Sequence, residues 1–297
     1  MTSWRSPAAA ATVALVGVTA VWGSTFVVVK DAIERMPVMD FLAWRFAIAA
    51  LVMAAVRPRA VARLDRAGRR HGLLLGLALA GGYVAQTFGL QRTPATVSGF
   101  ITGLFVVFTP LCAAAVLRRR VEAASWLGVV VATAGLALLS LHGLSVGTGE
   151  AITLLCAVAF ALHIVGLGEW STAADAYGLA VLQLTTVAGV SVVAAAPDSL
   201  RPPPDAGAWG AVLLTAIAAT AVAFFVQTWA QAHLPPTRAA VVMTMEPVFA
   251  GIFGVAVGGD QLSARTVAGA LLVLAAMYLV EIGPRRGADA RVERLEA

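Results

Sequence analysis

The chain has 297 residues, of which 60% are hydrophobic and only 12% are charged, and its formal net charge is +5. A soluble domain carries about 25% charged residues, so this composition excludes an ordinary water-soluble domain and favours a chain embedded in a lipid bilayer. The two cysteines and four histidines are scattered without metal-ligand spacing, and no catalytic motif is present, so no metal, no cofactor and no enzymatic activity is expected.

The dominant feature of the sequence is a series of apolar runs of about 20 residues, the length that crosses the hydrocarbon core of a bilayer. The first is too long for the apolar part of a signal peptide, so it is expected to be a membrane helix rather than a cleaved leader. In chain order the runs are 9–29, 38–56, 72–91, 95–117, 123–141, 149–168, 178–196, 207–232, 236–258 and 264–283. We therefore predict an all-α membrane protein with ten transmembrane helices.

The first three runs carry polar and aromatic residues that are costly in hydrocarbon and tend to face a wet interior. Trp22 and Ser24 lie in the first run, and Tyr83 and Gln86 share one face of the third. Trp22 and Tyr83 either form the aromatic walls of a binding cavity or simply pack. Arg45, two turns into the second run, is a candidate coupling charge, but near a helix end it can also extend to the surface in a structural role.

The later runs add further polar residues, each with a structural alternative. Thr102 either faces a cavity or bonds a carbonyl of its own helix. His163 is either a site residue or a hydrogen-bonded core histidine, and Gln227 lines a cavity or bonds a neighbouring helix. Trp229, two residues after Gln227, is expected to form part of the aromatic wall of the same cavity. Glu246, the only acidic residue well inside a run, is a candidate coupling charge or a structural charge. The fifth and tenth runs are almost bare, so they are expected to pack outside the others.

Part of the third run recurs 141 residues later. The sequence Gln-Thr-Phe at 86–88 becomes Gln-Thr-Trp at 227–229, and a proline follows eight residues after each glutamine. Five helices per copy is an odd number, so the two copies must cross the membrane in opposite senses. The predicted units are residues 1–145, residues 146–284 and a charged tail, 285–297. Inverted repeats around a central cavity are typical of transporters.

Two features refine this topology. Six arginines lie between residues 57 and 71, and basic residues concentrate in cytoplasmic loops. This places both termini in the cytoplasm and removes the need for a nucleic-acid partner. Pro110 and Pro247 fall inside apolar runs, where a bend is predicted because proline lacks an N–H donor.

Four segments resemble the signatures of the EamA family within the drug/metabolite transporter superfamily. They are WGSTFVVVK (22–30), FLAWRF (41–46), SGFITGLFVVFTPL (98–111) and MEPVFAGIFGVAVGGDQLS (245–263). The resemblance spans residues 9–283. Within the family, the chain is similar to the bacterial amino-acid exporters, particularly the exporters of aromatic amino acids. The resemblance implies ten helices in two inverted repeats, a central cavity and alternating access. Gly259-Asp260 stands where family members often have Gly-Glu, so the charge roles at that helix end are not transferred.

These observations together predict a multi-pass exporter of amino acids, aromatic or broad in range, or of similar small metabolites, in the bacterial inner membrane. The expected partners are a small-molecule substrate and the lipid bilayer, and the oligomeric state is open. A multidrug or other metabolite exporter of the same fold is the alternative. A nucleotide-sugar carrier is disfavoured because Arg45 is the only cation within the helices. An enzyme or receptor is disfavoured because the chain shows neither an acid–base set nor a large loop surface.

Overall fold

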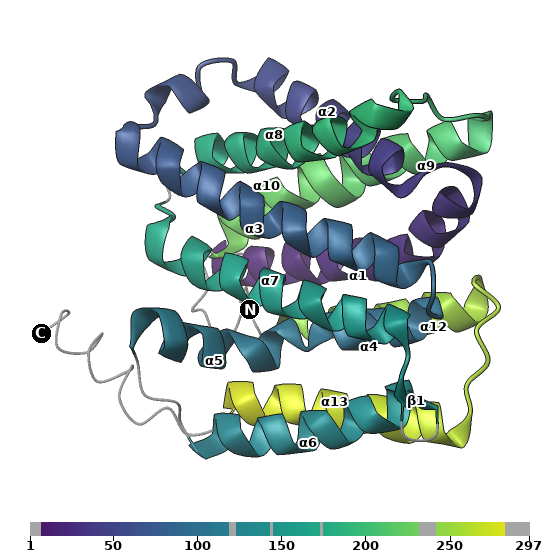
Figure 1. Ribbon diagram of the computed structural model, residues 1–297. Coiled ribbons are helices and arrows are strands. Elements are labelled where there is room, and N and C mark those ends of the chain that lie inside the picture. The colour runs from purple at the N-terminus through teal and green to yellow at the C-terminus, as the bar shows by residue number, and fades with distance from the viewer. Residues whose placement is uncertain (1–6, 119–122, 143–144, 173–174, 232–241, 283–297) are drawn as a thin grey trace, which may run out of the picture.

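The computed structural model describes residues 7–118, 123–142, 145–172, 175–231 and 242–282, and almost all of them are helical (Figure 1). The helices are α1 (Pro7–Arg35), α2 (Val38–Val56), α3 (Arg66–Leu90), α4 (Ala95–Gly103), α5 (Phe105–Leu117), α6 (Ala123–Ser140), α7 (Thr148–Trp170), α8 (Ala176–Ala195), α9 (Ala206–Ala216), α10 (Ala223–Gln231), α12 (Met245–Ala256) and α13 (Ala264–Ile282). A π-helix, η4 (Ile217–Val222), joins α9 to α10, and η2 (Val61–Arg63) and η3 (Ala196–Asp198) are short 3-10 turns. Two-residue strands β1 (Leu141–His142) and β2 (Ser145–Val146) pair antiparallel.

Seven helical segments of the described chain are long and apolar enough to cross a membrane, and three further apolar helices are shorter, at 126–139, 245–256 and 264–279. Their outward faces are apolar rather than charged, since Leu51, Leu77, Val130 and Leu155 are all exposed. Exposed aliphatic side chains in this number belong in lipid and not in water. The fold is therefore that of a helical membrane protein.

The helices form one bundle in which segments distant in sequence pack together. α3 lies against α7, α1 against α12, and α2 against α8. Figure 1 shows α6 and α13 side by side at one edge of the bundle, away from the helices at its centre. This is where the sequence placed the two runs that are poor in polar residues.

The predicted bends at Pro110 and Pro247 appear upstream of each proline. A single residue, Leu104, separates α4 from α5, and a turn at Thr244 precedes α12. A proline ring crowds the carbonyl four residues earlier, which for Pro247 adjoins the turn at Thr244. Pro247 consequently sits in the first turn of α12, where a missing N–H is tolerated. The break at Leu104 lies six residues before Pro110, which itself stands inside α5, so this effect does not account for it.

One end of the bundle is tied together by contacts between its connecting segments. The Lys30 Nζ donates to the Thr93 carbonyl at 2.6 Å, and the Thr96 N–H donates to the Asp260 carboxylate at 2.7 Å. Asp260 thus accepts from the start of α4, where the helix dipole favours an anion. Gly259, at φ 71°, allows the sharp turn that directs Asp260 there. The departure from the family sequence at 259–260 therefore has a structural role in this chain.

The same end carries an ion pair. Arg35, at the end of α1, pairs with Asp205, which begins α9 and accepts from the Ala208 N–H at 2.8 Å. The Ala208 N–H, followed by the Arg35 guanidinium, holds the pKa of the Asp205 carboxyl below its ordinary value. The Asp205 side chain is about half exposed to solvent, so this ion pair contributes little to stability.

Candidate functional site

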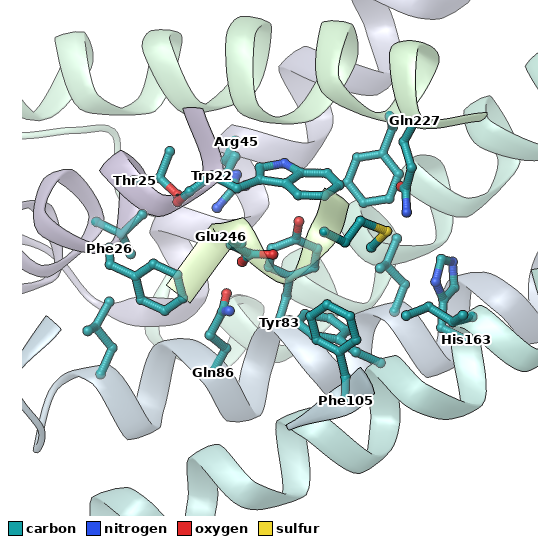
Figure 2. A pocket seen from close by; sticks show the side chains of 17 residues that line it. Trp22, Thr25, Phe26, Arg45, Tyr83, Gln86, Phe105, His163, Gln227 and Glu246 are labelled. Atoms are coloured by element: carbon teal, nitrogen blue, oxygen red, sulfur yellow. The ribbon is translucent and has the colours of Figure 1, made fainter. Parts of the chain in front are cut away.

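A small cavity lies at the centre of the bundle, between α1, α2, α3, α7, α10 and the start of α12 (Figure 2). Its volume is about 70 Å³. The lining side chains are Trp22, Thr25, Phe26, Val29, Arg45, Leu79, Tyr83, Gln86, Leu90, Phe105, Phe160, His163, Ile164, Phe224, Gln227, Met243 and Glu246. Most are aromatic or aliphatic, with a few polar groups among them, which is the composition of a small-molecule site.

Trp22 is fixed between two helices. Its indole Nε1 donates to the Ala219 carbonyl in η4 at 2.8 Å, and its ring lies 5.9 Å from that of Phe224. A π-helix changes the alignment of carbonyls relative to an α-helix, and such turns are frequent at functional sites. The π-turn therefore helps to hold one aromatic wall of the cavity.

Replacing Trp22 by phenylalanine is expected to lower the stability of the detergent-solubilised protein by at least about 1 kcal/mol, because the buried Ala219 carbonyl loses a hydrogen-bond donor and the smaller ring fills less of the site. Thermal unfolding measures the change. Trp126→Phe is the matched control, since Trp126 is 57% exposed on the outer face. Equal melting temperatures for the two variants would contradict the role given to the indole N–H.

Arg45 is buried and belongs to the cavity wall, so the interpretation that it extends to the surface was wrong. Its Nε donates to the Thr220 hydroxyl at 2.9 Å, and its guanidinium lies 4.9 Å from the Tyr83 ring centre and 5.2 Å from that of Phe46. Among the residues described, no carboxylate forms an ion pair with it. The Thr220 hydroxyl and the two aromatic rings therefore hold the guanidinium in place.

Glu246 lies in the first turn of α12, directly after the turn at Thr244. Figure 2 shows its carboxylate directed into the cavity, between Trp22 and the side chains of Tyr83 and Gln86. Within the described part of the chain this carboxylate has neither a hydrogen-bond partner nor an ion-pair partner. The helix N-terminus favours an anion at this position, and the cavity is left as the place where a cationic partner can bind.

Tyr83 is the centre of an aromatic cluster. Its ring makes edge contacts with Phe46 at 4.7 Å and Phe160 at 5.3 Å, and it lies 6.5 Å from Phe224. The neighbouring Gly82 makes this possible, since a Cβ there would lie 2.2 Å from the Phe160 ring. Edge-to-face packing restrains these rings, so the aromatic walls are firm.

The predicted amide and imidazole side chains line the cavity but differ in how far their hydrogen-bonding groups are already occupied by other residues. Gln86 donates to Thr102 across a long 3.5 Å contact, and Gln227 also lines the wall. The Nε2 of His163 lies 2.6 Å from the Oε1 of Gln183, an amide oxygen that accepts from it. His163 therefore borders the cavity while one nitrogen is already occupied, and the two glutamines are the more available hydrogen-bonding groups.

Three predicted site residues are not part of the cavity wall. The Ser24 hydroxyl donates to the Val21 carbonyl of its own helix at 2.7 Å. Thr102 is buried behind Gln86, with its oxygen 4.0 Å from the Cys156 sulfur. Trp229 is half-buried against the core. A hydroxyl can satisfy itself on the preceding turn of its helix, which removes the need to face a cavity.

The sequence did not single out Thr25, Phe105, Phe160, Phe224 or Met243, which also line the cavity. A usable signal was the 141-residue repeat. Four pairs of lining residues stand 141 positions apart: Trp22 and His163, Tyr83 and Phe224, Gln86 and Gln227, and Phe105 and Glu246. Phe105 and Glu246 also occupy matching places, because each follows a break in its helical segment.

The size of the cavity limits what it holds in this conformation. A volume of about 70 Å³ is well below the roughly 300–1,000 Å³ of typical small-molecule pockets. A solute of the size of an amino acid is therefore expected to need an outward shift of the surrounding helices. No group of three or more His, Cys, Asp or Glu side chains comes together in the described segments.

Comparison with known proteins finds a transporter family and transporters as relatives. The model of the EamA-like transporter family matches residues 9–141 and 147–282. An uncharacterized transporter of Archaeoglobus fulgidus is 32% identical over 89% of this chain and 83% of its own length. The uncharacterized inner membrane transporter YedA of Escherichia coli K12 is 24% identical over 91% of this chain and 90% of its own.

A solved crystal structure has the same fold, with a TM-score of 0.66 and 20% identity over 93% of this chain and 99% of the other. At this level of identity the likeness concerns the arrangement of helices alone.

Proposed function

This chain belongs to the EamA-like transporter family, and we propose that it exports amino acids, aromatic or broad in range, or similar small zwitterionic metabolites across the bacterial inner membrane. The bound solute lies in the central cavity between the two halves of the chain. Membership of a transporter family supports the transport activity, and the chemistry of the cavity supports the class of solute.

The observation that carries the proposal is the presence of one cationic and one anionic side chain in the same cavity, with no ion pair between them in the described structure. Arg45 offers a guanidinium suited to a carboxylate, and Glu246 offers a carboxylate suited to an ammonium group. Tyr83, Phe160 and Phe224 provide an apolar wall for the side chain of the solute. An α-amino acid carries these three features together.

The proposal includes ten membrane spans arranged as two inverted repeats, residues 1–145 and 146–284. The family model matches two segments of nearly equal length. Helix packing is consistent with a two-fold relation between them: α3 packs on α7 as α1 does on α9 and α10, and α1 packs on α12 as α7 does on α4 and α5. α6 packs on its own counterpart α13, and α2 on α8.

In this arrangement both termini and the tail 285–297 are cytoplasmic, on the side of the arginine-rich connection at 57–71. The tail lies outside the described residues. The opposite end is the one where Lys30 bonds the segment before α4 and Asp260 bonds the first turn of α4. Export by alternating access requires these contacts to break when the cavity opens to the side opposite the cytoplasm, and to form again when it closes.

Counterflow into proteoliposomes tests the proposal with three ligands that share one aromatic side chain: a free aromatic amino acid, its methyl ester and its N-acetyl derivative. The free amino acid is expected to exchange fastest, with each derivative slower by about 10-fold or more. The ester lacks the anion for Arg45 and the N-acetyl compound lacks the cation for Glu246, and a charge-assisted hydrogen bond contributes about 1.5–3 kcal/mol.

The panel also separates the alternatives. If the ester, a cation with an aromatic group, exchanged as fast as the free amino acid, the multidrug exporter would be favoured instead. If none of a broad set of amino acids exchanged above empty liposomes, the proposed substrate class would be wrong.

A further inference from the structure

A second cavity, of about 380 Å³, lies at the end of the bundle where α2 leads into η2, against the first turn of α8. Its walls include Arg57, Arg59 and Arg63 from the connection and Asp175 and Tyr177 from the start of α8. It has no lining residue in common with the central cavity. The transport proposal assigns no role to it.

The charge of this second cavity is positive. Its lining residues include three arginines and one aspartate, and the Asp175 carboxylate already accepts from the Thr172 hydroxyl at 2.9 Å. In the ranges that the structure describes, none of the three arginines forms an ion pair. Arginine binds phosphate through paired, charge-assisted hydrogen bonds, so three of them around one cavity suit a phosphate group.

The walls are ordered by contacts that do not need a ligand. The Arg57 guanidinium lies 5.0 Å from the centre of the Tyr177 ring, and the Tyr177 hydroxyl donates to the Met53 carbonyl at 2.8 Å. Gly178 lets the connection approach α8 closely, since a Cβ there would lie 2.7 Å from the Ala60 carbonyl oxygen. A cavity that is formed in advance loses less entropy when it binds an anion.

The position of the cavity indicates the source of the phosphate. The last turns of α2 expose Leu51 and Val56, at 69% and 68%, on the outer face of the bundle, and Arg57 follows directly. An apolar surface that leads into a basic cavity matches a phospholipid, with its acyl chains along α2 and its phosphate among the arginines. The general enrichment of arginine in cytoplasmic loops explains their number in this connection but not their shared cavity.

We propose that this cavity, formed by the 57–63 connection and the start of α8, binds the phosphate group of an anionic phospholipid from the surrounding leaflet. Binding there links the end of α2 to α8, two helices that pack along their lengths. The proposal is independent of the substrate class and of the central cavity.

Titration of the detergent-solubilised protein with phosphatidylglycerol, followed by thermal unfolding, tests the site. Phosphatidylglycerol is expected to raise the melting temperature, and phosphatidylcholine at the same concentration is expected to have little effect. The double variant Arg59→Gln/Arg63→Gln is expected to weaken the apparent affinity for phosphatidylglycerol by about 30-fold or more, because it removes charge-assisted hydrogen bonds to the phosphate that contribute about 10-fold or more each. The matched control is Arg66→Gln/Arg70→Gln, which removes the same charge from the start of α3, outside the cavity, and is expected to retain the affinity.

Several outcomes would overturn the proposal. Equal loss of affinity in both double variants would show general charge attraction rather than a site, and equal stabilisation by phosphatidylcholine would remove the requirement for an anionic lipid. Inorganic phosphate and glycerol 3-phosphate form a separate arm. If either raised the melting temperature as much as the lipid did and competed with it, the ligand would be a free phosphate and the lipid assignment would fail. Both variants are compared with the wild type without lipid, so that a folding defect is recognised.

Discussion

Replacing Glu246 by glutamine is expected to slow counterflow of a free amino acid by about 10- to 100-fold while leaving the protein folded. The carboxylate is directed into the cavity and has no partner among the described residues, so it is available to the ammonium group of the solute. Loss of one charge-assisted hydrogen bond costs about 1.5–3 kcal/mol, and each 1.4 kcal/mol corresponds to a factor of ten. Glutamine preserves the shape of the side chain, so the effect reports the charge.

The N-acetyl amino acid sharpens this experiment. It has no ammonium group, so its slow exchange is expected to be unaffected by Glu246→Gln. Glu34→Gln is the matched control, because Glu34 is an exposed glutamate in the last turn of α1 and is not among the residues that line the central cavity. An unchanged rate for the free amino acid in Glu246→Gln would contradict the role given to this carboxylate. A parallel fall for the N-acetyl compound would indicate damage to the cavity in general.

Replacing Gly23 by alanine is expected to destabilise the protein by about 1–3 kcal/mol and to reduce transport, through a displacement of α12 from α1. A Cβ at Gly23 would lie 2.5 Å from the Phe249 Cβ, 2.7 Å from the Ala250 nitrogen and 2.8 Å from the Glu246 carbonyl oxygen. Two of these three are backbone atoms, so no change of side-chain rotamer relieves the overlap. The helix that carries Glu246 must shift.

Gly17→Ala provides a matched control in the same helix. A Cβ at Gly17 meets no atom within 4 Å, and alanine is the better helix former by about 1 kcal/mol. This variant is therefore expected to be at least as stable as the wild type. Thermal unfolding in detergent and counterflow measure both variants. If Gly23→Ala matched Gly17→Ala in both, the close contact of α1 with α12 would not be required.

The central cavity combines duplicated and unique positions. The aromatic and amide walls recur in both halves, as with Tyr83 and Phe224 or Gln86 and Gln227. The charges do not recur, because Glu246 corresponds to Phe105 and Arg45 corresponds to Thr186 at the same spacing. The polarity of the cavity therefore comes from two residues whose counterparts at this spacing are uncharged, and under the proposed function this polarity would orient a solute with two unlike ends.

Two hydrogen bonds, from Lys30 to the Thr93 carbonyl and from the Thr96 N–H to Asp260, hold one end of the bundle closed in this conformation. Lys30 holds the segment before α4 and Asp260 holds the first turn of α4, and the central cavity between the helices is small, at about 70 Å³. These contacts are few and polar, and the segments they join are short connections. Such contacts can break and re-form at modest cost compared with the separation of the buried helix faces.

The sequence by itself determined that the chain is a helical membrane protein, because 60% hydrophobic residues and runs of about 20 apolar residues suit only lipid. It also identified much of the cavity wall: Trp22, Tyr83, Gln86, His163 and Gln227. A polar or aromatic residue at membrane depth has few acceptable surroundings, so its presence alone is informative.

Only the tertiary structure decided which polar residues line the central cavity. Ser24 bonds its own helix, Thr102 lies behind Gln86, and Arg45 enters the wall through Thr220, a residue of a π-turn that no local pattern indicated. A hydroxyl or guanidinium can be satisfied by any of several partners, and the choice depends on which helices lie beside it. That neighbourhood is set by contacts between residues far apart in the chain, as for Arg45 and Thr220, 175 positions apart.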